Sequence, residues 1–128
     1  MTRTRTGPYS RRKDVSEAEI LKQISDYLDI LMNQGRVIWV RHNPIRVIGG
    51  GKSLRIVKGR ESQKGAPDII LWKNVSIISG PVTFIIETKV RKGKLSDDQL
   101  RWKERADKIG LRYLVCRSFD DFRKVTGL

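Results

Sequence analysis

Two segments decide the fold of this chain: GAPDII at residues 65–70 and FIIETK at residues 84–89. Each sets an acidic residue, Asp68 or Glu87, at the edge of an apolar run that is typical of a buried strand. A buried carboxylate is costly unless it is paired or holds a metal. Because Lys89 follows two residues after Glu87, the two segments predict a metal site that faces a phosphate.

The composition indicates one folded domain whose partner is a polyanion. The chain has 128 residues, with 27 Lys and Arg against 14 Asp and Glu, and a formal net charge of +13. This length has room for one core, and the positive excess attracts nucleic acid. We expect residues 1–14, which are basic and poor in apolar side chains, to form a disordered tail, and residues 15–128 to form the single domain.

The cysteine count and the hydropathy exclude several other classes of protein. The single cysteine, Cys116, cannot form an internal disulfide, and together with the single histidine, His42, it cannot build a structural zinc site. No apolar stretch approaches the ~20 residues of a membrane span. We therefore expect a cytoplasmic, reducing compartment and no membrane partner.

Hydrophobic periodicity predicts an α/β chain with the core order αβββαβ. If the strands around Asp68 and Glu87 pair as an antiparallel hairpin centred near Ile77 and Ile78, the two carboxylates fall opposite one another, with Lys89 on the same face as Glu87. The predicted elements are helices at 16–33 and 96–109, strands at 36–42, 68–72, 82–90 and 111–117, a further short strand at 54–57 and a final short helix after residue 118.

Each long helix carries a polar residue that could serve the same site. In the first helix, Ser16 and Glu19 fit a capping box, whereas Glu17 lies within the apolar face and turns toward the interior. Glu17 could extend the acidic site to a second metal, although Glu19 competes for this role and a favourable charge in the first turn explains Glu17 equally well. In the second helix, Gln99 is the one polar member of the apolar stripe formed by Leu95, Trp102, Ala106 and Ile109.

These residues suit metal-assisted hydrolysis of a phosphodiester. Asp68 and Glu87 offer the oxygen ligands that hard divalent cations prefer, and the backbone carbonyl of Thr88 could supply a third. Lys89 would hold or polarise the attacking water and balance the phosphate charge. Gln99 could orient Lys89 or a phosphate oxygen.

Basic residues surround the two segments and are the candidate contacts to nucleic acid. One group lies in a glycine-containing segment before Asp68, and the other follows Lys89 directly. The alternative for the second group is a solvated charged turn. The candidates are Lys52, Arg55, Lys58, Arg60 and Lys64 in the first group and Arg91, Lys92 and Lys94 in the second.

Three motifs together resemble the PD-(D/E)XK nuclease superfamily, and more closely its virus-type replication-repair nuclease (VRR-NUC) domain. They are GAPD at 65–68, ETK at 87–89 and GKLSDDQ at 93–99, and the resemblance covers about residues 16–122. It implies a restriction-endonuclease-like core, a mixed sheet flanked by helices, with Mg²⁺ or Mn²⁺ as cofactor. It assigns Asp68 and Glu87 to the metal, Lys89 to catalysis and Gln99 to a supporting position.

From the motifs and the charge we expect a divalent-metal-dependent, structure-selective DNA endonuclease that acts at junctions or flaps. The resemblance is to small stand-alone members such as phages encode, and it implies a homodimer that works on branched DNA, in the host cytoplasm if phage-encoded and in DNA repair. The alternative is a non-catalytic basic nucleic-acid-binding protein whose acidic residues are structural. That alternative predicts salt-sensitive binding and no cleavage product with either metal.

Overall fold

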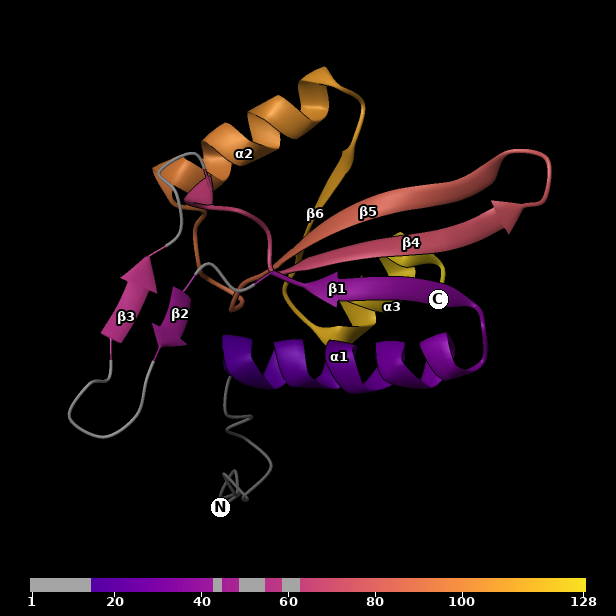
Figure 1. Ribbon diagram of the computed structural model, residues 1–128, viewed down its shortest axis with the longest axis horizontal. Helices are drawn as coiled ribbons and strands as arrows, with labels where there is room; N and C mark the ends of the chain where they lie inside the picture. Colours follow the sequence, from indigo (N-terminus) through magenta and orange to yellow (C-terminus); the bar gives the residue numbers. More distant parts are fainter. Residues whose placement is uncertain (1–14, 43–44, 49–54, 59–62) are drawn as a thin grey trace, which may run out of the picture.

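A four-stranded mixed sheet lies at the centre of the fold, as the sequence predicted (Figure 1). The computed structural model describes residues 15–42, 45–48, 55–58 and 63–128, so the predicted tail at 1–14 lies outside the described residues. The elements are α1 (Glu17–Asn33), β1 (Val37–Arg41), β2 (Ile45–Ile48), β3 (Arg55–Lys58), β4 (Ile69–Ser76), β5 (Gly80–Thr88), α2 (Asp97–Lys108), β6 (Arg112–Cys116) and α3 (Phe119–Thr126).

The strand order of the central sheet is β1-β4-β5-β6. β4 pairs antiparallel with both β1 and β5, whereas β6 pairs parallel with β5. A parallel pair needs a long crossover connection, and α2 supplies it between β5 and β6. The mixed sheet and its helices therefore match the restriction-endonuclease-like core predicted from the sequence.

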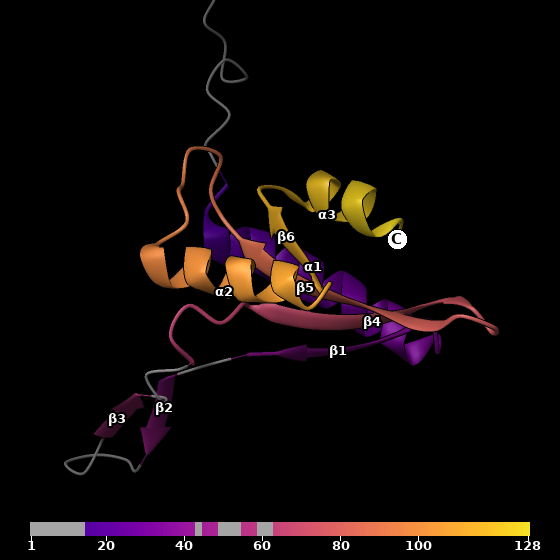
Figure 2. The same ribbon diagram turned by 90° about the horizontal axis from the view of Figure 1, so that it is seen from above.

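Helices cover both faces of the sheet (Figures 1 and 2). α1 and α3 cover one face, where they enclose the larger apolar core with Ile69, Leu71 and Ile86. α2 covers the other face, where a smaller cluster forms around Ile85 and Tyr113. The apolar stripe of α1 enters the larger core as the sequence predicted: Ile20, Ile24, Leu28 and Leu31 are all buried.

Serine side chains cap the N-terminus of each described helix. Ser16 accepts a hydrogen bond from the backbone nitrogen of Glu19, which confirms it as the N-cap of α1. Ser96 and Ser118 cap α2 and α3 in the same way. Side-chain oxygens at these positions satisfy backbone N–H groups that have no partner inside the helix. None of the described helices is long and apolar enough to cross a membrane.

The β4–β5 hairpin is longer than predicted. The predicted strands were 68–72 and 82–90, but β4 continues to Ser76 and β5 begins at Gly80, so only three residues turn the chain. A register shift lies between Asn74 and Ser76. At the tip, Ile77 and Ile78 are 96% and 100% exposed. Backbone pairing therefore extends beyond the buried residues, and alternating hydrophobicity does not reveal it.

Two further expectations about the elements need correction. A two-stranded antiparallel sheet of β2 and β3 lies apart from the central sheet (Figure 1); the sequence predicted β3 but missed β2, because a four-residue strand gives little periodicity. Ile109 was expected in the buried stripe of the second helix but is 75% exposed. The reason is that α2 ends at Lys108 and Ile109 is its C-cap, where the chain leaves the sheet.

Candidate active site

The β4–β5 register brings the two acidic segments together. Ile69 pairs with Ile86, so one residue further along the hairpin Asp68 lies opposite Glu87, which confirms the predicted register. Directly opposite residues in an antiparallel pair share a face of the sheet. Ile85 packs in the cluster under α2, so by alternation Glu87 and Asp68 lie on the α2 face.

Thr88 holds the Asp68 carboxylate with two hydrogen bonds. Its backbone nitrogen donates to Oδ2 of Asp68 at 2.8 Å, and its hydroxyl Oγ1 donates to the same oxygen at 2.9 Å. Thr88 is only 2% exposed, so both donors are shielded from water. Two donors on one oxygen fix the orientation of the Asp68 carboxylate and leave Oδ1 available for another ligand.

Glu87 is a buried carboxylate with one satisfied oxygen. The residue is 4% exposed, and Nε2 of Gln99 donates to its Oε1 at 2.7 Å. Its other oxygen, Oε2, is buried and has no hydrogen-bond partner in the described part of the chain. A buried acceptor without a donor is expensive, so Oε2 is the most obvious place on this face for a proton or a cation.

The surroundings of Glu87 favour its protonated form in the absence of a cation. Burial is the largest cause and raises the pKa of Glu87 to about 8, with the charges of Asp68 and Glu17 adding to the increase. The ammonium of Lys89 acts in the opposite direction and lowers the pKa. The three carboxylates and the Lys89 ammonium therefore interact electrostatically. Strongly shifted pKa values of this kind cluster at functional sites.

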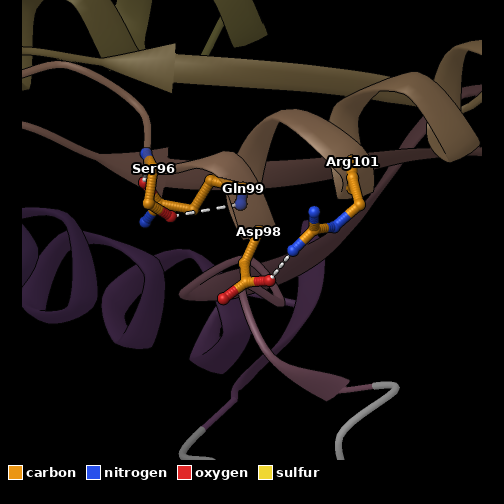
Figure 3. A network of polar contacts seen from close by, with 4 residues as sticks. All are labelled: Ser96, Asp98, Gln99 and Arg101. Atoms are coloured by element: carbon orange, nitrogen blue, oxygen red, sulfur yellow. Dashed lines mark hydrogen bonds and ion pairs between the residues drawn. The ribbon is translucent and has the colours of Figure 1, made fainter.

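Gln99 connects the Glu87 carboxylate to the first turn of α2. Its side-chain Oε1 accepts from the backbone nitrogen of Ser96 at 2.8 Å, while its backbone nitrogen donates to Ser96 Oγ at 3.2 Å (Figure 3). This reciprocal pair is a capping box. On the outer side of the same turn, Asp98 forms an ion pair with Arg101 (Figure 3). Gln99 was expected to orient Lys89 or a phosphate oxygen; the contact observed for its amide is the bond to Glu87.

The loop after β5 is fixed by Arg117, which the sequence analysis did not single out. The backbone nitrogen of Lys89 donates to the carbonyl of Cys116 at 3.1 Å, which extends the β5–β6 pairing beyond Thr88. The guanidinium of Arg117 donates to the carbonyl of Val90 at 2.8 Å and to that of Gly93 at 2.6 Å. The chain that carries Lys89 toward α2 is thus held from the end of β6.

The predicted role of Glu17 is only partly reflected in the geometry. Glu17 begins α1 and is exposed, so the expectation that it turns into the interior is wrong. The reason is its position in the first helical turn, where the apolar stripe has not yet reached the sheet. Its charge still raises the pKa of Glu87, whereas Glu19 contacts the Ser16 cap through its backbone nitrogen. Within the described ranges, no group of three or more His, Cys, Asp or Glu residues is arranged as metal ligands.

Two polar groups near the carboxylates, His42 and Tyr113, were not assigned to the site from the sequence. Arg41 pairs with Ile69, so His42 lies opposite Asp68, and its backbone nitrogen donates to the Asp68 carbonyl at 2.9 Å. Tyr113 packs under α2, and burial with the charges of Glu87 and Asp68 raises the pKa of its phenol. His42 Nε2 and the Tyr113 hydroxyl are both buried without a hydrogen-bond partner among the residues described.

The predicted nucleic-acid contacts fall into three structural groups. Arg91, Lys92 and Lys94 are exposed in the loop between β5 and α2. Lys64 is exposed just before the segment that carries Asp68, and Arg55 and Lys58 belong to β3. Lys52 and Arg60 lie outside the described residues. The exposed basic residues of the loop thus follow directly after the acidic pair and Lys89.

Sequence spacing contained the signal for some of what was missed. The pattern S-x-x-Q at residues 96–99 is a capping-box signature and could have predicted the bond between Gln99 and Ser96. The hydroxyl of Thr88 and the guanidinium of Arg117 gave no such signal, because each contacts residues distant in the chain. Their roles depend on the pairing of β5 with β6 and on the approach of Asp68 to the end of β5.

Comparison with known proteins gives the family. A model of the VRR-NUC domain matches residues 17–120, from the start of α1 to the start of α3, and so includes the elements that carry Asp68, Glu87, Lys89 and Gln99. No curated protein and no solved structure matches the chain. Because the matched residues span most of the chain and the fold agrees, this chain belongs to the VRR-NUC domain family, a family of nuclease domains.

Proposed function

We propose that this chain is a divalent-metal-dependent DNA endonuclease that hydrolyses phosphodiester bonds, with a preference for branched substrates such as junctions or flaps. The observation that carries the proposal is the facing pair of carboxylates, Asp68 and Glu87, at the open end of the β4–β5 hairpin. Lys89 follows directly after the end of β5 and acts electrostatically on Glu87. Nuclease activity as such is the activity of the family.

The donor atoms at this position suit Mg²⁺ or Mn²⁺. Glu87 Oε2 is a buried oxygen that lacks a partner within the described ranges, and the Thr88 donors bind only Oδ2 of the facing Asp68 carboxylate. The N–H and C=O of one strand residue point to the same neighbouring strand. Because the Thr88 N–H donates to Asp68, the Thr88 carbonyl lies on the Asp68 side as a third candidate ligand. Hard divalent cations select oxygen ligands of these kinds.

A cation held by Asp68, Glu87 and the Thr88 carbonyl would supply charge stabilisation for the phosphate and activate a water molecule. The protein residues do the positioning. Thr88 fixes the Asp68 carboxylate, and Gln99 fixes Oε1 of Glu87 and leaves Oε2 to the cation. The Lys89 ammonium holds the attacking water or a phosphate oxygen and offsets the negative charge. Glu17 is retained in the proposal as an outer acidic contact, since its charge acts on Glu87.

The proposed path of the nucleic acid follows the basic residues near the site. Arg91, Lys92 and Lys94 occupy the exposed loop after Lys89, and Lys64 precedes the Asp68 segment. Arg55 and Lys58 in β3, with Lys52 and Arg60, complete the proposed set of phosphate contacts. Each phosphate contact should steepen the salt dependence of binding, because counterions are released. We propose a cytoplasmic, reducing setting, as expected from the sequence.

We further propose that the active form is a homodimer, since a two-fold pair of small domains presents two sites to a symmetric branched substrate. Light scattering of the purified chain with and without a four-way junction tests this. After the mass of the junction is subtracted, a protein mass of twice 14.8 kDa is expected in the complex, and a single chain of protein in both samples would contradict the proposal.

Cleavage of a panel of DNA substrates tests the function. Four-way junction, flap, splayed and linear duplex DNA are incubated with Mg²⁺, Mn²⁺ or EDTA. We expect cleavage with either metal, strongest on the branched substrates, and none with EDTA. Asp68→Asn, whose amide oxygen can still accept from Thr88, and Lys89→Met should abolish cleavage without loss of the fold. Lys108→Met removes an exposed charge from the last turn of α2 and should cut like the wild type.

Two outcomes would contradict the proposal. Undiminished cleavage by Asp68→Asn and Lys89→Met would show that these residues are not catalytic. Tight, salt-sensitive binding by the wild type without any product on any substrate would instead identify a non-catalytic nucleic-acid-binding protein.

A further inference from the structure

Gly65 lies against the first turn of α2 at a distance that only glycine allows. A Cβ built on Gly65 would lie 2.4 Å from the carbonyl carbon of Asp98 and 2.6 Å from the backbone nitrogen of Gln99. Gly65 also has a φ of +79°, in the left-handed region that side chains rarely adopt. The atoms in the way belong to the backbone of a capped helix, so they cannot move aside as the end of a flexible side chain would.

This contact connects the two carboxylates of the site by a short route. Gly65 precedes Asp68 by three residues, and the intervening Pro67 is fully buried. On the other side of the contact, Gln99 donates to Glu87 at 2.7 Å. Thr88, adjacent to Glu87 in the chain, donates in turn to Asp68. Backbone, the hydrogen bonds and the packing contact of Gly65 with α2 therefore form a closed ring around the two carboxylates.

We propose that Gly65 is a positioning residue whose contact with the first turn of α2 fixes the separation of the Asp68 and Glu87 carboxylates, and thereby sets the affinity of the site for a divalent cation. The inference rests on the proposed function for the identity of this ligand. Gly65 touches neither the cation nor the substrate and acts through Gln99 on one side and Asp68 on the other. A side chain at this position would push α2 away from the sheet and carry Gln99 away from Glu87.

The chain offers a matched control for Gly65→Ala. Gly110 has a φ of +77°, close to that of Gly65, but no atom of the described residues lies within 4 Å of a Cβ built on it. It follows α2 at the end opposite to Gln99. Gly65→Ala and Gly110→Ala therefore impose the same backbone strain, and only the first adds a collision with α2. A difference between the variants reports the collision.

The test measures Mn²⁺ binding by titration calorimetry and DNA cleavage in parallel, at a temperature where circular dichroism shows each variant folded. Gly65→Ala should raise the Kd for Mn²⁺ by about tenfold or more, the usual effect of losing the support of a metal ligand. Its cleavage rate should fall by about 100-fold, as for a 1 Å misplacement of reacting groups. Gly110→Ala should stay within about twofold of the wild type in both measurements, because its site geometry is untouched.

Equal Mn²⁺ affinities for Gly65→Ala and Gly110→Ala, or no Mn²⁺ binding by the wild type, would overturn the inference. If the wild type binds Mn²⁺ but cuts no DNA, the proposed function fails while the binding comparison still decides the role of Gly65. If Gly65→Ala does not fold, Ala66→Gly replaces it, since it frees the backbone between Gly65 and Asp68 without adding an atom. We then expect about a threefold rise in the Kd for Mn²⁺ or more, and an unchanged Kd would overturn the inference.

Discussion

Replacement of Glu87 with Gln should stabilise the metal-free protein at alkaline pH and leave its stability nearly unchanged at pH 5. The glutamine amide has the shape of the protonated acid, and its oxygen can still accept from Gln99. The glutamine side chain is neutral, whereas burial and the charge of Asp68 make the ionised form of Glu87 unfavourable. A substitution inside the candidate active site should therefore increase the free energy of unfolding, in contrast to most substitutions of buried residues.

The magnitude follows from the pKa of the carboxyl in the folded and unfolded chain. The pKa is raised from 4.5 to about 8 in the folded protein. Between these values the unfolded chain releases a proton that the native protein retains, so the free energy of unfolding falls as the pH rises. Each pKa unit corresponds to about 1.4 kcal/mol, so the upper bound is about 5 kcal/mol at pH 9 and about 3 kcal/mol at pH 7.

Urea unfolding at pH 5, 7 and 9 in EDTA measures this effect. The advantage of Glu87→Gln over the wild type should grow across the three values, up to the bound given by the pKa. Glu104→Gln removes the same charge from an exposed position on α2, where the side chain is 70% exposed, and its pH profile should parallel that of the wild type. Addition of Mn²⁺ should stabilise the wild type more than Glu87→Gln, since a cation needs the carboxylate.

A constant difference between Glu87→Gln and the wild type from pH 5 to pH 9 would refute this reasoning. It would mean that Glu87 is ionised in the native protein throughout, so that the unpartnered Oε2 is satisfied by a donor rather than by a proton. The wild-type profile alone cannot decide this, because other carboxylates titrate in the same range. The comparison with the isosteric amide removes their contribution.

Three further changes test the supports around the site. Gln99→Ala should lower the free energy of unfolding by about 1–3 kcal/mol in urea, because it leaves a buried acceptor without its donor, whereas the exposed Gln23→Ala should not; equal losses would contradict the role of the amide. Arg117→Ala should speed hydrogen exchange of the loop amides at 90–93 several-fold, and Arg112→Ala should leave them unchanged; slow exchange in both variants would show that the guanidinium does not hold the loop. Burial raises the pKa of the Cys116 thiol to about 12, so a thiol reagent should label it only in urea, and rapid labelling of the native protein would contradict its burial.

The sequence predicts the fold well wherever a residue pattern reports burial. The stripe of α1, the serine caps and the pairing of β4 with β5 all follow from local spacing. Pairing that continues in solvent leaves no such pattern, which explains why the exposed end of the hairpin was not predicted. β2 was missed because its four residues give little periodicity. Ile109 was placed wrongly because periodicity does not show where a helix leaves the sheet it covers.

The features of the candidate site likewise fall into those that local spacing predicts and those that only tertiary packing creates. Asp68 and Glu87 could be brought face to face from the sequence, because they lie on consecutive strands joined by one turn. The hydroxyl of Thr88 and the close approach of Gly65 to α2 depend on tertiary packing, which spacing cannot give. For Gln99 the sequence identified the residue but not its partner, since a polar interruption of an apolar stripe does not say which buried group requires it.

The distant tip of the β4–β5 hairpin constrains which insertions and deletions this fold can accept during evolution. The tip lies about 23 Å along β5 from Glu87, at ~3.3 Å per residue over the intervening strand. Insertion of one residue there, if transmitted along the hairpin, would exchange the two faces of one strand and turn Asp68 or Glu87 to the wrong side. The shift between Asn74 and Ser76 shows where such a change can be absorbed. Turn variants should therefore be tolerated when they alter this bulge or add residues in pairs, and single insertions between the bulge and the carboxylates should be lost.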